Sequence, residues 1–182
     1  MQRIVVFGAS GSGKTTLGRW LAERQALPFT DLDDLHWREG WIECPTDEFR
    51  AAADAITRGQ RWVISGNQSK ARDLLWPRAD TLVWLDLPLA TVLWRSAARA
   101  MRDWWIGAQI CNGNRQRLWM MVNGRDSLLG YTLRTHHERR GEWPRALSLP
   151  EHRHARAFRL RSRAEIAAWQ AQLQAGKIPV DR

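Results

Sequence analysis

Short apolar runs alternate with longer amphipathic stretches along the 182-residue chain. Continuous apolar runs between turn residues are typical of strands buried on both faces, whereas apolar positions three and four residues apart indicate helices. The runs predict strands at residues 3–7, 29–32, 61–65, 81–86 and 156–160. The amphipathic stretches predict helices at about 14–25, 47–57, 87–102 and 163–174, with Thr46 as the cap of the second. This alternation favours an α/β protein with a parallel sheet of about five strands and helices on both faces.

The pattern blurs between residues 103 and 150, where five glycines and two prolines interrupt it. We predict a mobile loop, then a helix near residues 126–138, then a second loop. A segment of this kind can close over a bound nucleotide and exclude water. We therefore expect a lid at about residues 103–150, within a single domain that spans residues 1–182.

The formal net charge of +9 comes from one region of the chain. Residues 87–163 contain fifteen arginines, no lysine and only five acidic residues, while the remaining parts are close to balanced. Arginine is suited to a planar, bidentate grip on phosphate, although a basic surface also attracts nucleic acid. Because the excess coincides with the expected lid, the phosphate interpretation is favoured.

Other compositional features indicate the cellular setting. The two cysteines, Cys44 and Cys111, are too few for a disulfide scaffold and lack the spacing of a metal knuckle, so we expect reduced thiols. We find no long apolar span and no signal-peptide pattern at the first residues, which predicts a cytoplasmic protein without a membrane anchor.

A complete phosphate-binding loop, G-x-x-x-x-G-K-[ST], lies between the first predicted strand and the following helix. Glycines let the backbone approach a polyphosphate and direct N–H groups at it, and the helix N-terminus favours the anion. We expect Lys14 to reach the β- and γ-phosphates and Thr15 to place its hydroxyl on Mg²⁺. The predicted nucleotide-binding residues are Gly8, Ala9, Ser10, Gly11, Ser12, Gly13, Lys14, Thr15 and Thr16.

Three acidic residues lie at the end of the second predicted strand and just after it, close to the sheet edge where ligands bind in open α/β folds. If Leu32 points into the core, strand alternation places Asp31 and Asp33 together on the opposite side. They could bind Mg²⁺ through water or accept a proton from an acceptor hydroxyl. We expect Asp33 to be functional, leave Asp31 open between these roles and a solvated turn, and expect Asp34 at the surface.

Arginines at spacings of four and three residues, Arg95, Arg99 and Arg102, share one face of the helix after the fourth predicted strand. They form either a solvated stripe or, at the entrance to the lid, a phosphate contact by one or two of them. Arg115 is a further candidate. We select Arg99 and Arg115, with Lys14 and Asp33, as candidate catalytic residues, because arginines can stabilise charge in the transition state. Weaker candidates are Arg134, Arg139 and Arg140.

The ends of the third and fourth predicted strands differ in their polar residues. Asp86 ends the fourth strand, but the following Leu87-Pro88 is typical of a helix start, so we interpret Asp86 as structural. The third strand ends in Ser65-Gly66-Asn67-Gln68, whose neutral groups can orient a substrate but supply no carboxylate. Most of the twelve tryptophans are expected in the core and the lid interface, and Trp37 or Trp41 could stack on a planar ring.

The chain resembles the adenylate-kinase-like and shikimate-kinase-like P-loop kinases, and more closely the bacterial proteins labelled DNA topology modulation proteins or adenylate-kinase-like kinases. The segments that carry this resemblance are residues 8–16, 32–37, 40–41, 62–67, 79–88, 113–115 and 126–129. The resemblance implies a P-loop NTPase fold in three layers, an arginine-rich lid insertion, ATP with Mg²⁺, and phosphoryl transfer to a small acceptor.

One departure bears on the metal site. These relatives usually have Ile-Asp-Gly-Asn-Tyr where this chain has Ile64-Ser65-Gly66-Asn67-Gln68, so the carboxylate at the usual magnesium-water position is missing. Shikimate-kinase-like enzymes use an aspartate after the second strand, which implies that Asp31 or Asp33 takes over this role.

The sequence favours an ATP-dependent kinase whose acceptor is a nucleoside monophosphate, a nucleoside or another small hydroxyl compound. Two alternatives stay open. One is a nucleotide-gated nucleic-acid-binding protein that uses the basic region, and the other is an ATP sensor without turnover, which rests on Ser65. The sequence assigns neither the acceptor nor the oligomeric state.

Overall fold

A five-stranded parallel sheet forms the centre of the computed structural model, which describes residues 1–115 and 127–178. The strand order is β2-β5-β1-β6-β9, and every neighbouring pair is parallel. The strands are β1 (Arg3–Gly8), β2 (Phe29–Asp31), β5 (Trp62–Ser65), β6 (Thr81–Leu85) and β9 (Arg156–Leu160). All five predicted strands are therefore confirmed, with their ends shifted by no more than one residue.

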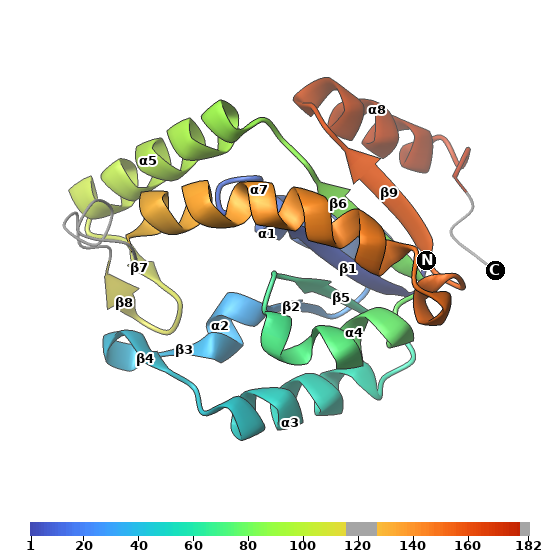
Figure 1. Ribbon diagram of the computed structural model, residues 1–182, viewed down its shortest axis with the longest axis horizontal. Coiled ribbons are helices and arrows are strands. Elements are labelled where there is room, and N and C mark those ends of the chain that lie inside the picture. The colour runs from blue at the N-terminus through green and yellow to red at the C-terminus, as the bar shows by residue number, and fades with distance from the viewer. Residues whose placement is uncertain (116–126, 179–182) are drawn as a thin grey trace.

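Helices cover both faces of this sheet (Figure 1). Those described are α1 (Lys14–Gln25), α2 (Leu32–His36), α3 (Thr46–Thr57), α4 (Arg72–Arg78), α5 (Leu89–Trp105), α7 (Leu128–Leu147) and α8 (Arg163–Gln174). Helices α3, α4 and α7 contribute to one apolar cluster, and α1 and α8 contribute to the cluster on the other face. The predicted three-layer α/β fold is confirmed.

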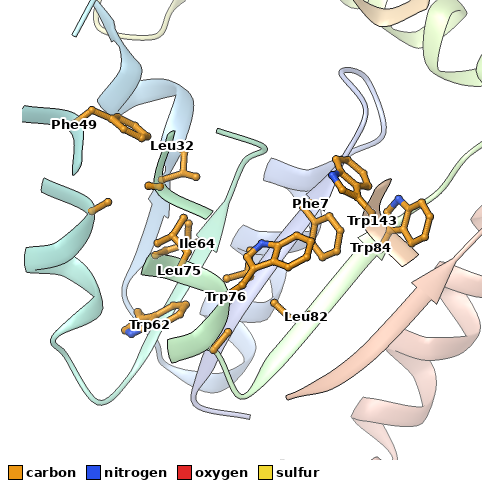
Figure 2. Close-up of a cluster of buried hydrophobic side chains, with 14 residues drawn as sticks. Phe7, Leu32, Phe49, Trp62, Ile64, Leu75, Trp76, Leu82, Trp84 and Trp143 are labelled. Carbon is orange, nitrogen blue, oxygen red and sulfur yellow. The ribbon is translucent and has the colours of Figure 1, made fainter. Parts of the chain in front are cut away.

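Alternation along β1 separates the two clusters. Val5 and Phe7 belong to the cluster beneath α3, α4 and α7, whereas Ile4 and Val6 belong to the cluster beneath α1 and α8. All four side chains are buried, which explains the continuous apolar run. In the first cluster the Phe7 ring lies 4.7 Å from Trp76 and 5.0 Å from Trp143, between centroids (Figure 2).

The segment after α5 differs from the prediction. A hairpin of β7 (Gln109–Ile110) and β8 (Asn114–Arg115) follows α5, and α7 then runs through Gly141 and Pro144 to Leu147. The second predicted loop is therefore wrong up to Leu147. Burial of Trp143 against Phe7 and Trp84 stabilises the fold by roughly 4–6 kcal/mol. This is more than the roughly 3 kcal/mol of destabilisation expected from Pro144 inside the helix. The lid itself stays a prediction for the residues between α5 and α7.

Short elements complete the fold near the ends of the strands. They are the hairpin of β3 (Trp37–Arg38) and β4 (Ile42–Glu43), and the 3₁₀ turns η1 (Glu39–Trp41), η2 (Ser69–Ala71) and η3 (Pro150–His152). Helices α2 and α4 escaped the sequence prediction because they have only five and seven residues. Among the described residues, no helix is long and apolar enough to cross a membrane.

Two smaller predictions are corrected. Thr46 is the first residue of α3 and not its cap, because Pro45 occupies the N-cap position without a side-chain hydrogen bond. Five of the described tryptophans are buried in the core as predicted and Trp20 packs against a core cluster, but three on α5 are exposed. The buried ones are Trp62, Trp76, Trp84, Trp143 and Trp169, and the exposed ones are Trp94, Trp104 and Trp105.

Candidate nucleotide and acceptor site

The phosphate-binding loop connects β1 to α1 and lies against α5. Gly11 and Gly13 have φ values of 74° and 97°, in the left-handed region that favours glycine. A Cβ atom on Gly11 would lie 2.4 Å from the Ser96 hydroxyl and 2.7 Å from the Val92 carbonyl oxygen. The loop therefore needs glycine at this position both for its conformation and for its close approach to α5.

Lys14 begins α1 and turns back across the loop. Its Nζ donates to the Ala9 carbonyl oxygen at 3.2 Å. Burial lowers the pKa of Lys14, the nearby carboxylates of Asp33 and Asp31 oppose this shift, and the charges of Arg99 and Arg139 add to it. Two candidate acidic residues and two candidate arginines thus lie within electrostatic reach of the lysine.

Arg95 is the arginine of α5 that contacts the loop. Its Nη1 donates to the Ser12 carbonyl oxygen at 3.3 Å, and its Nη2 lies 3.3 Å from the place a Cβ on Gly13 would take. Burial lowers the pKa of Arg95, and the charges of Arg163 and Arg99 contribute. Arg99 is exposed and makes no ion pair with the described residues, whereas Arg102 pairs with Asp103.

Thr15 and Asp31 are brought together at the carboxyl ends of the strands. The Thr15 hydroxyl donates to Asp31 Oδ2 at 2.7 Å. Asp31 is directly opposite Ser65 in the pairing of β2 with β5, and the Ser65 hydroxyl is fully buried without a hydrogen-bond partner. A hydroxyl, a carboxylate and an unpaired buried hydroxyl are oxygen ligands that suit Mg²⁺ or its waters, so these residues fit the ion.

The residues that directly follow β5 supply no carboxylate, and the carboxylate that binds the Thr15 hydroxyl comes from Asp31 on the neighbouring strand β2. Among the described residues, no group of three or more His, Cys, Asp or Glu side chains could hold a metal by itself. Mg²⁺ is commonly held by one or two protein groups together with substrate phosphates and water, and the Thr15 and Asp31 pair matches this mode.

Asp33 lies beside Asp31, but for a different reason from the one predicted. β2 ends at Asp31, and Leu32 is buried as the first residue of α2, so strand alternation does not extend to Asp33. Asp31 instead caps α2 through Oδ1, which accepts from the Asp33 backbone N–H at 3.1 Å. The Asp33 carboxylate accepts from Gln68 Nε2 at 3.2 Å, and Asp34 is exposed as expected.

Asn67 holds the start of the loop and was missed by the sequence reasoning as a loop-positioning residue. The Gly8 N–H donates to Asn67 Oδ1 at 2.9 Å, while Asn67 Nδ2 donates to the Gly8 carbonyl oxygen. One side chain thereby satisfies both backbone groups at the end of β1. The signal available was an amide residue two positions after a strand that pairs with β1.

Asp86 is structural, as predicted, but it forms ion pairs and is not part of a helix start, because α5 begins at Leu89 with Pro88 as its N-cap. Its Oδ1 accepts from Arg140 Nε at 2.6 Å, and its Oδ2 accepts from Arg159 Nε at 2.9 Å and Nη2 at 2.6 Å. Arg159 also stacks over Trp84, 4.2 Å from the ring centroid. Both carboxylate oxygens are therefore occupied, and they tie α7 and β9 to the end of β6.

The other predicted arginines occupy different places. Arg139 donates to the Tyr131 hydroxyl at 2.5 Å and lies 5.5 Å from the centroid of the Trp143 ring. Arg134 lies over the Tyr131 ring. Arg115 is exposed on β8, at the base of the expected lid. Of the weaker candidates, Arg139 is thus the one whose charge reaches Lys14.

The hairpin of β7 and β8 faces the segment that follows α2 (Figure 1). In that segment the Trp37 and Trp41 rings meet edge to face at 5.5 Å, and Trp41 Nε1 donates to the Arg115 carbonyl oxygen at 3.2 Å. Cys44 and Cys111 are both free, and burial raises the pKa of the Cys111 thiol to about 12, with the charges of Asp33, Asp34 and Asp31 adding. Cys111 is therefore a protonated thiol at neutral pH.

A comparison with protein families identifies the family to which this chain belongs. The family model of shikimate kinase matches residues 10–119, which is more than half of the chain. The chain belongs to the shikimate kinase family. This confirms the coarser resemblance, to P-loop kinases of the shikimate-kinase-like type.

Individual relatives of this family member are distant. A shikimate kinase from Sulfurihydrogenibium sp. (strain YO3AOP1) is 32% identical over 108 residues, which cover 51% of this chain and 65% of the relative. The match thus spans less than two thirds of that relative's length.

Solved kinase structures share the fold at low sequence identity. A gluconokinase from Sinorhizobium meliloti 1021 is 22% identical, with a TM-score of 0.51, and the alignment covers 97% of this chain and 98% of that one. A shikimate kinase from Acinetobacter baumannii in complex with shikimate is 18% identical, with a TM-score of 0.55 and coverage of 100% and 96%.

Proposed function

We propose that this protein is an ATP-dependent kinase that transfers the γ-phosphoryl group to a hydroxyl group of a small acceptor. The observation that carries the proposal is the meeting of the phosphate loop with two aspartates of different surroundings. Asp31 is bound to the Thr15 hydroxyl, whereas Asp33 is more open and faces Gln68. Phosphoryl transfer needs a metal-side carboxylate and an acceptor-side carboxylate, and the two positions supply one of each.

On the nucleotide side, Lys14 and the loop amides hold the phosphates of ATP. Thr15 and Asp31, with the buried Ser65 hydroxyl beside them, hold Mg²⁺ or its waters. When bound, the ion neutralises charge that develops on the phosphate oxygens. Burial lowers the pKa of Lys14, and the neighbouring aspartates oppose this shift and so favour the charged form of the lysine next to these oxygens.

On the acceptor side, Asp33 accepts the proton of the attacking hydroxyl, and the amide of Gln68 holds this carboxylate in place. Arg99 and Arg115 are the arginines that we assign to charge stabilisation, since both are exposed and lack ion pairs among the described residues. The charge of Arg99 reaches Lys14, and Arg115 lies on the hairpin that contacts Trp41. Arg139 joins them because its charge reaches Lys14.

The acceptor that these surroundings favour is a small hydroxylated acid. Arg99, Arg115 and Arg139 have no carboxylate partner among the described residues, and Lys14 and the loop amides already bind the phosphates of ATP. The positive charge of these arginines therefore suits an acceptor with its own negative charge. The names of the relatives, shikimate kinase and gluconokinase, point to compounds of this class. Nucleosides and nucleoside monophosphates stay in the range of acceptors to be tested.

Binding of nucleic acid is the less favoured alternative. We also propose, from the sequence resemblance alone, a narrower relationship to the proteins labelled DNA topology modulation proteins. Three arginines of the basic region are engaged by carboxylates, namely Arg102 by Asp103, and Arg140 and Arg159 by Asp86. Arg95 faces the phosphate loop. These contacts reduce the basic surface that a phosphate backbone could meet.

The test is ATP consumption and acceptor phosphorylation with a panel of hydroxylated acids, sugars, nucleosides and nucleoside monophosphates. We expect turnover with at least one small acceptor, and a loss of about 10²-fold or more in Lys14→Ala. Lys177→Ala removes an exposed lysine that follows α8, outside the proposed site, so it is the matched control and should retain full turnover. ATP binding without transfer to any acceptor would instead support the sensor, and equal turnover in Lys14→Ala would refute the assignment.

A further inference from the structure

Two side-chain amides join the β7–β8 hairpin to the segment that carries Asp33. Asn114 is 4% exposed, and its Oδ1 accepts from the Trp41 N–H at 2.8 Å. Its Nδ2 donates to the carbonyl oxygens of Arg38 at 2.9 Å and Cys111 at 2.6 Å. A single buried side chain therefore satisfies three backbone groups from two segments that are at least 70 residues apart in the sequence.

Asn112 forms a second set of hydrogen bonds between the hairpin and the C-terminal end of α2. A helix leaves its last carbonyl oxygens without partners inside the helix. The Trp37 N–H donates to the Asp33 carbonyl oxygen, and Asn112 Nδ2 donates to those of Asp34 at 2.6 Å and Trp37 at 2.7 Å. The hairpin thus completes the C-terminal end of the short helix on which Asp33 lies.

Backbone strain gathers at the same junction. Trp41, Cys111 and Asn112 have φ values of 62°, 37° and 59°, and they are three of the four non-glycine residues with positive φ among those described. Such conformations cost of order 1–3 kcal/mol each and persist only where the surroundings hold them. For Trp41 the holding contacts are the side-chain Oδ1 of Asn114, which accepts from the Trp41 backbone N–H, and the backbone carbonyl oxygen of Arg115, which accepts from Trp41 Nε1.

We propose that Asn112 and Asn114 are positioning residues that lock the β7–β8 hairpin onto residues 34–41, so that Asp33 and Arg115 are held as one unit for the acceptor. The phosphate loop has its own supports in Asn67 and Arg95 and does not depend on this lock. Loss of the lock therefore weakens acceptor use and leaves nucleotide binding intact. The turnover part of this inference rests on the proposed kinase function.

The decisive variant is Asn112→Gly. Glycine adopts a φ of 59° without strain, so the turn itself is preserved or improved while both hydrogen bonds to α2 are lost. A residue that only forms the turn and a residue that locks two segments therefore give opposite results. Asn114→Asp is the second variant, because it keeps the acceptor for Trp41 but turns the two donors into an oxygen facing carbonyl groups.

The full-length protein is compared by hydrogen exchange, by calorimetric titration with ADP and Mg²⁺, and by turnover with the best acceptor of the panel. In Asn112→Gly we expect amide exchange in residues 34–43 to rise at least about tenfold, the change expected for two lost hydrogen bonds. ADP affinity should stay within about twofold, and kcat/KM for the acceptor should fall roughly 10- to 100-fold, with the larger part in KM. Gln109→Ala, an exposed hairpin residue, is the control that should match the wild type.

Unchanged or slower exchange in residues 34–43 of Asn112→Gly would overturn the lock, as would a loss of ADP affinity as large as the loss of acceptor use. If Asn114→Asp fails to fold, Asn112→Gly still decides. If no acceptor is phosphorylated by the wild type, the kinase proposal fails, yet exchange and ADP affinity still decide whether the hairpin holds residues 34–41.

Discussion

The phosphate loop of the nucleotide side is one continuous stretch of chain, residues 8–15, whereas the acceptor side joins residues 34–41 to residues 109–115. On the nucleotide side, positive φ values belong to glycines, Gly11 and Gly13, which adopt them at little cost. On the acceptor side they fall on Trp41, Cys111 and Asn112, in addition to Gly40 and Gly113. The loop thus has a conformation that its own glycines favour, with added support from Asn67 and Arg95, whereas the acceptor side depends on contacts between distant segments.

This difference has a consequence for binding. A loop whose conformation is intrinsic presents its amides before the nucleotide arrives, so little ordering is required on binding. A junction that stores strain and depends on a few side-chain hydrogen bonds has a lower cost of local opening. We expect the acceptor side to be the part that adapts, and the nucleotide side to be the part that stays fixed.

The largest effect should come from the two aspartates at the boundary between these sides. Asp33→Asn removes the proton acceptor, so kcat should fall by about 10²- to 10⁴-fold while the Mg²⁺ requirement stays unchanged.

Asp31→Asn keeps the cap on α2, since asparagine also accepts from the Asp33 N–H, but it removes the charge beside Thr15. The Mg²⁺ concentration for half-maximal rate should therefore rise about 10- to 100-fold.

Steady-state turnover at a series of Mg²⁺ concentrations separates the two variants. An Asp33→Asn protein with wild-type kcat would remove the acceptor role from this residue. A wild-type Mg²⁺ profile in Asp31→Asn would show that Thr15 and Ser65 hold the ion without it.

A smaller effect tests how rigid the nucleotide side is. In Gly11→Ala the new methyl group meets the Val92 carbonyl oxygen, which is backbone and cannot turn away, so the loop must shift. We expect a loss of roughly 2–4 kcal/mol in the free energy of unfolding, from crowding and left-handed strain together, and a large loss of ADP affinity.

Gly107→Ala is the matched control for Gly11→Ala. Gly107 has a φ of 61° and no atom within 4 Å of the added Cβ, so only strain of about 1–2 kcal/mol should appear, without any change in ADP affinity. Urea unfolding and calorimetric titration measure both quantities. Equal ADP affinity in Gly11→Ala and the wild type would mean that the loop adapts after all.

The same contrast explains what the sequence could and could not predict. The bounds of β9 and α8 were predicted to the residue, because apolar patterning is a local feature. The phosphate loop was predicted for the same reason. The length of α7 was not, because the burial of Trp143 outweighs the local effect of Pro144.

On the acceptor side the decisive contacts are invisible in local sequence. Asn112 and Asn114 bind backbone carbonyl and N–H groups 73 to 78 residues away, apart from the local bond to Cys111. Every residue other than proline has the same backbone N–H and carbonyl groups, so the sequence does not indicate which residue an asparagine side chain will bind through its backbone. Asn67 escaped prediction in the same way, since it binds the Gly8 backbone 59 residues away.

The smallest predicted effect concerns acid and again separates the two sides. His36 ends α2, is 5% exposed, and packs edge to face against Trp37 and Phe49. Burial lowers the pKa of His36, the charge of Lys70 adds to this shift, and Glu43 and Asp33 oppose it. The neutral ring is therefore the folded form, and protonation is easier in the unfolded chain.

Because the folded pKa of His36 lies below the unfolded value of about 6.5, its contribution to stability is complete above that pH and is lost as the pH falls toward the folded pKa. One group contributes a slope of at most about 1.4 kcal/mol per pH unit. His36→Phe keeps the ring contacts without the titration, so its urea-unfolding free energy should vary less between pH 7 and pH 5 than that of the wild type. His137→Gln, at an exposed position of α7, should follow the wild type.

Hydrogen exchange at pH 5 should rise in residues 34–44 before it rises in residues 8–16, and the reverse order would contradict the view that the acceptor side is the adaptable one.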